Sequence, residues 1–129
     1  MNHQEKKAFS LIARLGSLKY ALRGIAIFIQ NTHNAWVEIF FGIVFVILGC
    51  YFSITEGEWL SLIIVIFVMI MAEAFNTAIE IHMNLTSPGH HPFARDTKDI
   101  AAGAVFISAM LAAVVALIIF VPHIISFLK

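Results

Sequence analysis

Three long apolar stretches alternate with short polar segments along the chain. We expect each stretch to form a membrane-spanning helix, over residues 35–55, 59–82 and 100–121, because about 20 apolar residues cross the hydrocarbon core of a bilayer. Residues 55–58 form a tight polar turn between the first two spans. Residues 84–99 contain two prolines, a glycine and mixed charges, which is typical of a polar connection with a Pro-Gly turn. The pattern therefore predicts three spans joined by two short connections.

The segment before the first span, residues 1–30, has a different pattern. Leucine and isoleucine recur at spacings of three and four residues with basic residues between them, which is typical of an amphipathic helix lying in the membrane interface. The apolar positions are Leu11, Leu15, Leu18, Leu22 and Ile25. A soluble amphipathic helix packed on the bundle explains the pattern equally well. Either interpretation keeps this segment at the membrane surface.

The composition agrees with this pattern. The 129-residue chain is 60% hydrophobic and 12% charged, with a mean hydropathy of +0.92. Soluble proteins average about 45–50% apolar and about 25% charged residues, so a separate soluble catalytic domain is excluded. The predicted fold class is an all-α membrane protein, with an N-terminal amphipathic surface helix and three transmembrane helices in one domain, 1–129. Eight basic residues balance eight acidic ones, which gives no support for nucleic-acid binding.

The basic residues indicate the orientation in the membrane. They precede the first span or lie in the second connection, whereas the first connection carries only Glu56 and Glu58. These basic residues are Lys6, Lys7, Arg14, Lys19, Arg23, Arg95 and Lys98. Cytoplasmic segments next to spans are enriched in Lys and Arg, so we expect the N-terminus and residues 84–99 on the cytoplasmic side of the inner membrane. The C-terminus, with Lys129, is then outside.

A polar stripe runs along the second predicted span. At about 100° per residue, five side chains fall within about 100° of one another on the helix surface. They are Glu73, Asn76, Thr77, Glu80 and Asn84. An ionisable residue at membrane depth is costly, which makes it a functional candidate. Two acids on one face indicate a divalent metal with its ligand or a base beside an acyl-chain region, whereas the structural alternative is that both are neutralised and only stabilise helix packing.

A second cluster, Lys98 and Asp99, lies at the predicted entry to the third span. A lysine near a helix N-terminus suits a phosphate group, although Asp99 alone also fits the simpler role of N-cap. With the two glutamates, these residues supply the metal and phosphate ligands that phosphoryl transfer needs. Neither common nucleotide-binding loop, GxxxxGK[ST] or GxGxxG, occurs in the chain.

Several motifs together resemble the prokaryotic diacylglycerol kinase and undecaprenol kinase family. The residues that carry the resemblance are EAFNTAIE at 73–80, Ser87-Pro88, His91-Pro92 and Ala94, KDIAAGA at 98–104, and KYALRG at 19–24. The similarity covers about residues 19–121. It implies a small homotrimeric inner-membrane enzyme with sites shared between subunits, which transfers the γ-phosphate of ATP to a lipid hydroxyl with Mg²⁺. The implied lipid is diacylglycerol or undecaprenol.

The resemblance also implies roles for individual residues. Glu73 corresponds to the catalytic base, Asn76 to a polar partner in the site, and Glu80 to a metal ligand. The implied nucleotide-binding residues are Lys98, Asp99, Asn84 and Tyr20.

Two positions depart from the family pattern. Thr32 stands where the family has a metal-binding Glu, and Asn84 stands where it has Asp. Because Mg²⁺ prefers carboxylate and phosphate oxygens, losing a carboxylate should weaken the metal site. Glu38 is a further acid near this region. The sequence therefore predicts a lipid kinase, with a weakened or inactive relative that only binds nucleotide or lipid as the alternative; an ion pathway fits Glu73 but leaves the Lys98 cluster unexplained.

Overall fold

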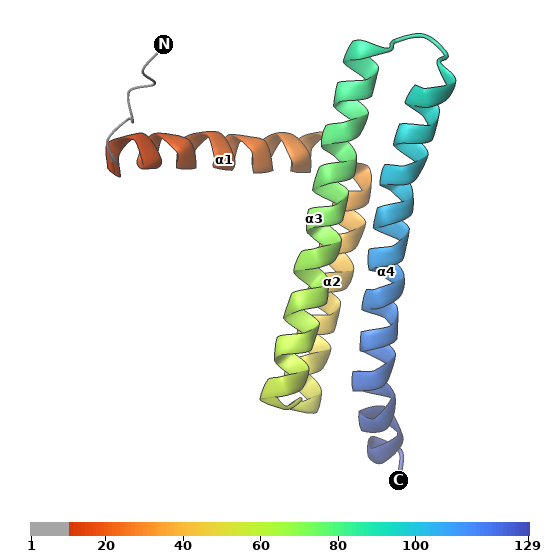
Figure 1. Ribbon diagram of the computed structural model, residues 1–129. Helices are drawn as coiled ribbons and strands as arrows, with labels where there is room; N and C mark the ends of the chain where they lie inside the picture. Colours follow the sequence, from red (N-terminus) through yellow and green to blue (C-terminus); the bar gives the residue numbers. More distant parts are fainter. Residues whose placement is uncertain (1–10) are drawn as a thin grey trace, which may run out of the picture.

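A computed structural model describes residues 11–129 as four helices. They are α1 (Leu11–Asn31), α2 (His33–Phe52), α3 (Glu56–Thr86) and α4 (Pro92–Phe127), and no strand occurs between residues 11 and 129 (Figure 1). The all-α class is confirmed. The first ten residues of the expected surface helix lie outside the described residues.

Helices α2, α3 and α4 are each long and apolar enough to cross a membrane. They contain 20, 31 and 36 residues. At about 1.5 Å per residue, α3 extends about 46 Å and α4 about 54 Å, whereas the hydrocarbon core of a bilayer is about 30 Å thick. The chain is therefore a membrane protein whose α3 and α4 are longer than the hydrocarbon layer.

The second connection is shorter than the polar segment 84–99 suggested. Helix α3 continues to Thr86 and α4 begins at Pro92, so only residues 87–91 join them. Proline is favoured in the first turn of a helix because it has no N–H to leave unpaired, which explains the early start of α4. The N-cap of α4 is His91. The interpretation of Asp99 as the N-cap is therefore wrong, because Asp99 lies two turns inside the helix.

The three long helices run side by side, and α1 leaves them crosswise (Figure 1). The most extensive packing is between α3 and α4. Helix α2 packs on α3, and its aromatic side chains also meet α4, as in the stacked rings of Phe45 and Phe120 at 5.7 Å. A buried cluster fills one end of the bundle. It consists of Ile54, Leu62, Ala116, Ile119 and Phe120.

Glycine allows α2 to approach its neighbours closely. A Cβ atom at Gly49 would lie 2.8 Å from the Trp59 ring, and one at Gly42 would lie 3.4 Å from Ile66. Both glycines are buried. The packing of α2 therefore depends on the absence of a side chain at Gly49, whereas a Cβ at Gly42 would make an ordinary contact.

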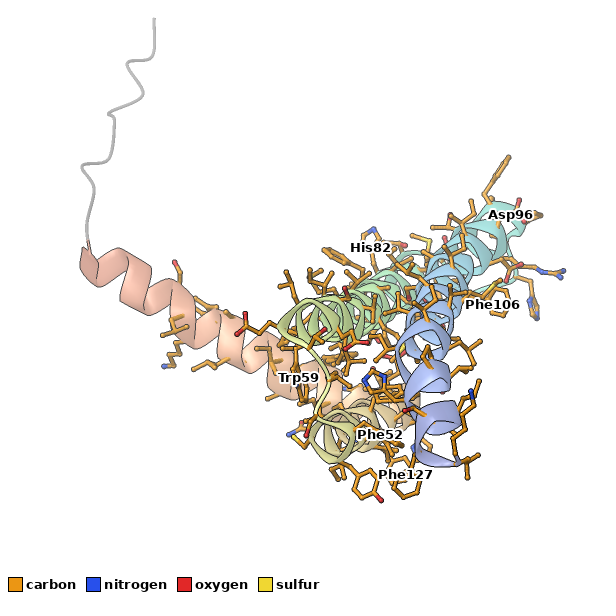
Figure 2. The ribbon with its side chains drawn as sticks, turned by 90° about the horizontal axis from the view of Figure 1, so that it is seen from below. Phe52, Trp59, His82, Asp96, Phe106 and Phe127 are labelled. Atoms are coloured by element: carbon orange, nitrogen blue, oxygen red, sulfur yellow. The ribbon has the colours of Figure 1, made fainter. Side chains whose placement is uncertain are left out.

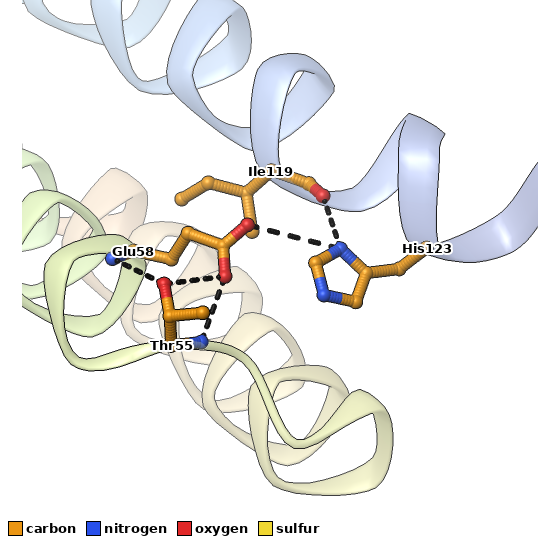
Figure 3. A network of polar contacts seen from close by, with 4 residues as sticks. All are labelled: Thr55, Glu58, Ile119 and His123. Carbon is orange, nitrogen blue, oxygen red and sulfur yellow. Dashed lines mark hydrogen bonds and ion pairs between the residues drawn. The ribbon is translucent and has the colours of Figure 1, made fainter. Parts of the chain in front are cut away.

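Polar contacts join the ends of α3 and α4 near this cluster (Figure 3). Glu58 accepts hydrogen bonds from the backbone N–H of Thr55 at 2.7 Å and from its hydroxyl at 2.8 Å, while the Glu58 N–H donates back to that hydroxyl at 3.4 Å. This reciprocal arrangement caps α3. His123 Nδ1 lies 2.8 Å from the carbonyl of Ile119 and 3.8 Å from a Glu58 oxygen, so the cap also contacts α4.

Apolar side chains project outward from the bundle (Figure 2). Phe106 and Phe127, for example, are each 67% exposed. A soluble monomer rarely exposes so much apolar surface, whereas lipid or neighbouring transmembrane helices cover it in a membrane. The outer surface thus agrees with the lengths of the helices.

Candidate functional site

The polar stripe of α3 passes from the interior of the bundle to its surface. Glu73 is 2% exposed, and Asn76 and Thr77 are 8% exposed. Glu80 and Asn84, further along the same face, are exposed. Glu73 and Glu80 are seven residues apart, about 10.5 Å along the helix axis. One face of α3 therefore presents a buried acid and an exposed acid about two turns apart.

Helix α2 brings two further polar side chains to Glu73. The Asn34 side chain lies close enough to the Glu73 carboxylate to interact with it. Glu38, one turn further along α2, lies close enough to interact electrostatically with Glu73. The sequence singled out Glu38 only as a nearby acid and did not single out Asn34. A helical wheel of α2 places both on one face, four residues apart, but which face meets α3 depends on packing.

Thr32 contacts the stripe from the start of α2. Its hydroxyl lies 2.8 Å from the hydroxyl of Thr77, which itself donates to the backbone carbonyl of Glu73 at 2.9 Å. Thr32 is the N-cap of α2 but makes no side-chain capping bond. Its hydroxyl therefore links α2 to α3 beside Glu73.

At the other end of the stripe, Lys98 Nζ donates a 2.6 Å hydrogen bond to Asn84 Oδ1. This contact joins α3 to α4 next to residues 87–91. Asp99 lies 3.6 Å from Arg95 in an exposed pair along α4. An open cavity of about 410 Å³ adjoins these residues. Its lining is Ser87, Gly89, His90, His91, Ala94, Arg95, Lys98 and Asp99.

Two candidate residues make no hydrogen bond or ion pair to the others within residues 16–129. Tyr20 lies on α1 and is 72% exposed. Glu80 is exposed and makes no hydrogen bond or ion pair to another residue in the part of the chain that the structure describes. Within residues 11–129, no group of three or more His, Cys, Asp or Glu side chains gathers as a metal cage.

The donor set nevertheless fits one kind of metal. Mg²⁺ is usually held by one or two protein carboxylates, with phosphate oxygens and water completing its shell. Glu80 offers a free, exposed carboxylate of this kind about two turns from Glu73. Thr32 offers only a hydroxyl that is already bonded to Thr77. The residues therefore suit an ion that arrives with a phosphate ligand better than an ion held by protein alone.

The site contains three chemically different groups, two on α3 and one on α4. Glu73 is a shielded carboxylate suited to accepting a proton. Glu80 is an exposed oxygen ligand, and Lys98 is a cation beside an open cavity at the hairpin end. A base, a metal ligand and a cation are the kinds of group that phosphoryl transfer uses.

Comparison with known proteins gives two matches. A family model described as prokaryotic diacylglycerol kinase matches residues 19–120. The undecaprenol kinase of Bacillus subtilis (strain 168) is 38% identical over 76 residues. That alignment covers 59% of this chain and 62% of the relative, so it spans less than two thirds of the relative's length. The family match includes every candidate site residue from Tyr20 to Asp99.

Proposed function

The chain belongs to the prokaryotic diacylglycerol kinase family, and on this basis we propose that it transfers the γ-phosphate of ATP to the hydroxyl group of a membrane lipid. Diacylglycerol and undecaprenol are the candidate lipids, and the matched relative from Bacillus subtilis is named for the second. The observation that carries the proposal is the position of buried Glu73 about two turns from exposed Glu80 on the same face of α3.

Glu73 is the proposed general base. Its carboxylate is shielded from water and has one oxygen without a hydrogen-bond partner, so it can accept the proton of a lipid hydroxyl. Asn76 lies one turn further along the same face and also has an unpartnered oxygen. We assign Asn76 to positioning that hydroxyl beside Glu73.

Glu80 and Lys98 are the proposed nucleotide-side residues. Lys98 offsets phosphate charge, because its hydrogen-bond partner within residues 16–129 is the neutral amide of Asn84. Glu80 would hold Mg²⁺, which supplies charge neutralisation at the phosphate oxygens when bound. Asp99, Asn84 and Tyr20 complete the proposed ATP contacts at the cytoplasmic end of the bundle.

We also propose a homotrimer with sites shared between subunits, placed in the cytoplasmic membrane with the N-terminus inside and the C-terminus outside. The apolar outer surface and the one-sided distribution of Lys and Arg support this arrangement. Chemical cross-linking in membranes should yield trimers. Labelling of single cysteines introduced at residues 90 and 129 should report opposite sides.

The central test is a lipid kinase assay. Purified protein is incubated with ATP, Mg²⁺ and either diacylglycerol or undecaprenol in mixed micelles, and the phosphorylated lipid is measured. Glu73→Gln should lower kcat by about 10²–10⁴, the usual contribution of a general base. Glu80→Ala should raise the Mg²⁺ requirement. The control is Glu56→Gln, since Glu56 is exposed at the opposite end of α3 and should leave activity unchanged.

The assay also separates the proposal from its alternative. Full activity of Glu73→Gln, or activity of Glu80→Ala that is undiminished at every Mg²⁺ concentration, would contradict the assigned roles. A wild-type protein that binds ATP but phosphorylates neither lipid would identify the chain as a binding relative of the family.

A further inference from the structure

Thr32 occupies the N-cap position of α2 but does not use its hydroxyl to cap that helix. A threonine at an N-cap usually accepts a hydrogen bond from a backbone N–H in the first turn. Thr32 makes no such bond, and its hydroxyl lies 2.8 Å from the hydroxyl of Thr77 on α3. A contact between two helices thus takes the place of a contact within one helix.

Thr77 extends this contact to the proposed base. Its side chain is 8% exposed, and its hydroxyl donates a 2.9 Å hydrogen bond to the backbone carbonyl of Glu73, one turn earlier in α3. A threonine that bonds to the carbonyl four residues earlier often bends its helix locally, so this bond affects the backbone at Glu73 itself. Two hydroxyl groups therefore form a continuous hydrogen-bonded chain from the start of α2 to the residue that carries the base.

The corner between α1 and α2 holds Thr32 from its other side. The backbone N–H of Thr32 donates to the carbonyl of Phe28 at 3.1 Å. Trp36 Nε1, from the first turn of α2, donates to the carbonyl of Ile29 at 3.1 Å. Both bonds use carbonyls in the last turn of α1, where helix geometry leaves such groups without a partner. The backbone that carries the Thr32 hydroxyl is therefore fixed to the end of α1 as well as to α2.

From these contacts we infer that Thr32 and Thr77 act as one unit that positions Glu73, and the catalytic part of this inference rests on the proposed function. Both threonines are positioning residues, because they act on the reaction through the backbone of Glu73. A reacting group must be held within about 0.5 Å of its productive place, and a displacement of about 1 Å can lower a rate about 10²-fold. Breaking the chain should slow the chemical step and leave ATP binding unchanged.

This role differs from metal binding, the role that the family resemblance implies for the residue at position 32. Mg²⁺ prefers carboxylate and phosphate oxygens, and the Thr32 hydroxyl is already bonded to Thr77. If Thr32 held the ion, loss of its hydroxyl would raise the Mg²⁺ concentration needed for activity. If Thr32 positions Glu73, the same loss lowers kcat at every Mg²⁺ concentration. The two roles therefore predict different kinetic changes.

The first test compares valine variants in the lipid kinase assay, since valine removes the hydroxyl and keeps the shape of threonine. Thr77→Val should lower kcat about tenfold, with KM for ATP and the Mg²⁺ requirement unchanged. Thr32→Val should lower kcat by a smaller factor, because the bond from Thr77 to Glu73 remains. The double variant should be no slower than Thr77→Val, since the chain is already broken. Losses that multiply in the double variant, an unchanged kcat in Thr77→Val, or a raised Mg²⁺ requirement in Thr32→Val would overturn the inference.

Serine variants and a matched threonine distinguish positioning from a general effect of the substitution. Thr32→Ser and Thr77→Ser keep both hydroxyls and should retain the wild-type kcat. Thr86→Val is the control on the same helix, because the exposed Thr86 hydroxyl also bonds to a carbonyl four residues earlier, that of His82 at 2.8 Å. It should leave kcat unchanged. A Thr77→Ser variant as slow as Thr77→Val, or equal losses in Thr86→Val and Thr77→Val, would contradict the role of the chain.

The second test needs no substrate, so it separates this inference from the proposed function. Thermal unfolding in detergent is measured for the two valine variants and for the double variant. Residues in one hydrogen-bonded chain have non-additive effects, so the double variant should unfold at the temperature of Thr77→Val. Unfolding that is lowered by the sum of the two single losses overturns the inference, even in an active kinase. Non-additive unfolding in a protein that phosphorylates neither lipid supports the link between the threonines, and only the kinase proposal fails.

Discussion

Thr32 donates its hydroxyl hydrogen to Thr77 across 2.8 Å. The direction follows from the second bond in the chain, because Thr77 uses its own hydrogen to reach the carbonyl of Glu73 at 2.9 Å. The position where the family resemblance predicts a metal-binding acid is therefore neutral here and already bonded. In this chain the link holds α2 against α3 beside the proposed base.

Restoring an acid at this position should strengthen Mg²⁺ binding. In Thr32→Glu, Thr77 can turn its hydrogen toward the new carboxylate, which adds a second oxygen ligand near Glu80. We expect the Mg²⁺ concentration for half-maximal activity to fall about tenfold, which corresponds to about 1.4 kcal/mol. Kinase assays over a Mg²⁺ series measure this change. Thr32→Val is the control, since it removes the link without adding a ligand, and an unchanged Mg²⁺ requirement in Thr32→Glu would count against the metal site.

Removing the charge of Lys98 should weaken ATP binding. The Asn84 amide holds Lys98 in place without neutralising it, so the positive charge remains available for phosphate. Lys98→Met should raise KM for ATP about tenfold, the scale of one charge-assisted hydrogen bond, and should leave KM for the lipid unchanged. Steady-state kinetics with each substrate varied in turn give both values. Lys129→Met is the matched control at the far end of the bundle, and an equal change in both constants would contradict a nucleotide-specific role.

Adding one methyl group at Gly49 should destabilise the bundle. The new Cβ would lie 2.8 Å from the Trp59 ring and 3.1 Å from Ile54. Overpacking of this kind costs about 1–3 kcal/mol. Thermal unfolding in detergent should show the loss for Gly49→Ala. By contrast, Gly103→Ala meets nothing within 4 Å and should stabilise α4 slightly, by about 0.5–1 kcal/mol.

The α3 cap should contribute to stability without affecting the site. Thr55→Ala removes the hydroxyl that accepts from the Glu58 N–H and should cost about 1 kcal/mol. Ser61→Ala, which removes an exposed hydroxyl bonded to the Gly57 carbonyl, should cost less than about 0.5 kcal/mol. Unfolding temperatures compare the two variants. A loss of lipid kinase activity larger than the loss of folded protein would show that the cap acts on the site.

The sequence predicted the helices because apolar length and polar interruptions depend on local order alone. It also grouped Glu73, Asn76 and Thr77 on one face, since the angle between positions on a single helix is set by helix geometry. The sequence alone could not predict that Asn34 approaches Glu73. That contact depends on how α2 rotates against α3, and this rotation depends on packing such as the close approach of Gly49 to Trp59.

The predicted bounds of the second connection, 84–99, were wrong for a related reason. Polar and charged residues from 92 to 99 were interpreted as loop, yet they form exposed turns of α4 that start at Pro92. Polar residues indicate contact with water. A helix that extends past the apolar layer exposes such residues to water as well as a loop does. Lys98 therefore faces Asn84 from a regular helix, which holds the pair more rigidly than a loop would.

Helix α1 runs across the axis of the bundle and so marks one level along it. The contact between Thr32 and Thr77 ties α1 to one level of α3, with Glu73 one turn on one side of it and Glu80 on the other. A host membrane that becomes thicker or thinner must then be accommodated at the opposite tips of the helices, near the Thr55 turn. The distance of each acid from the level of α1 along the bundle axis would stay constant in membranes of different thickness.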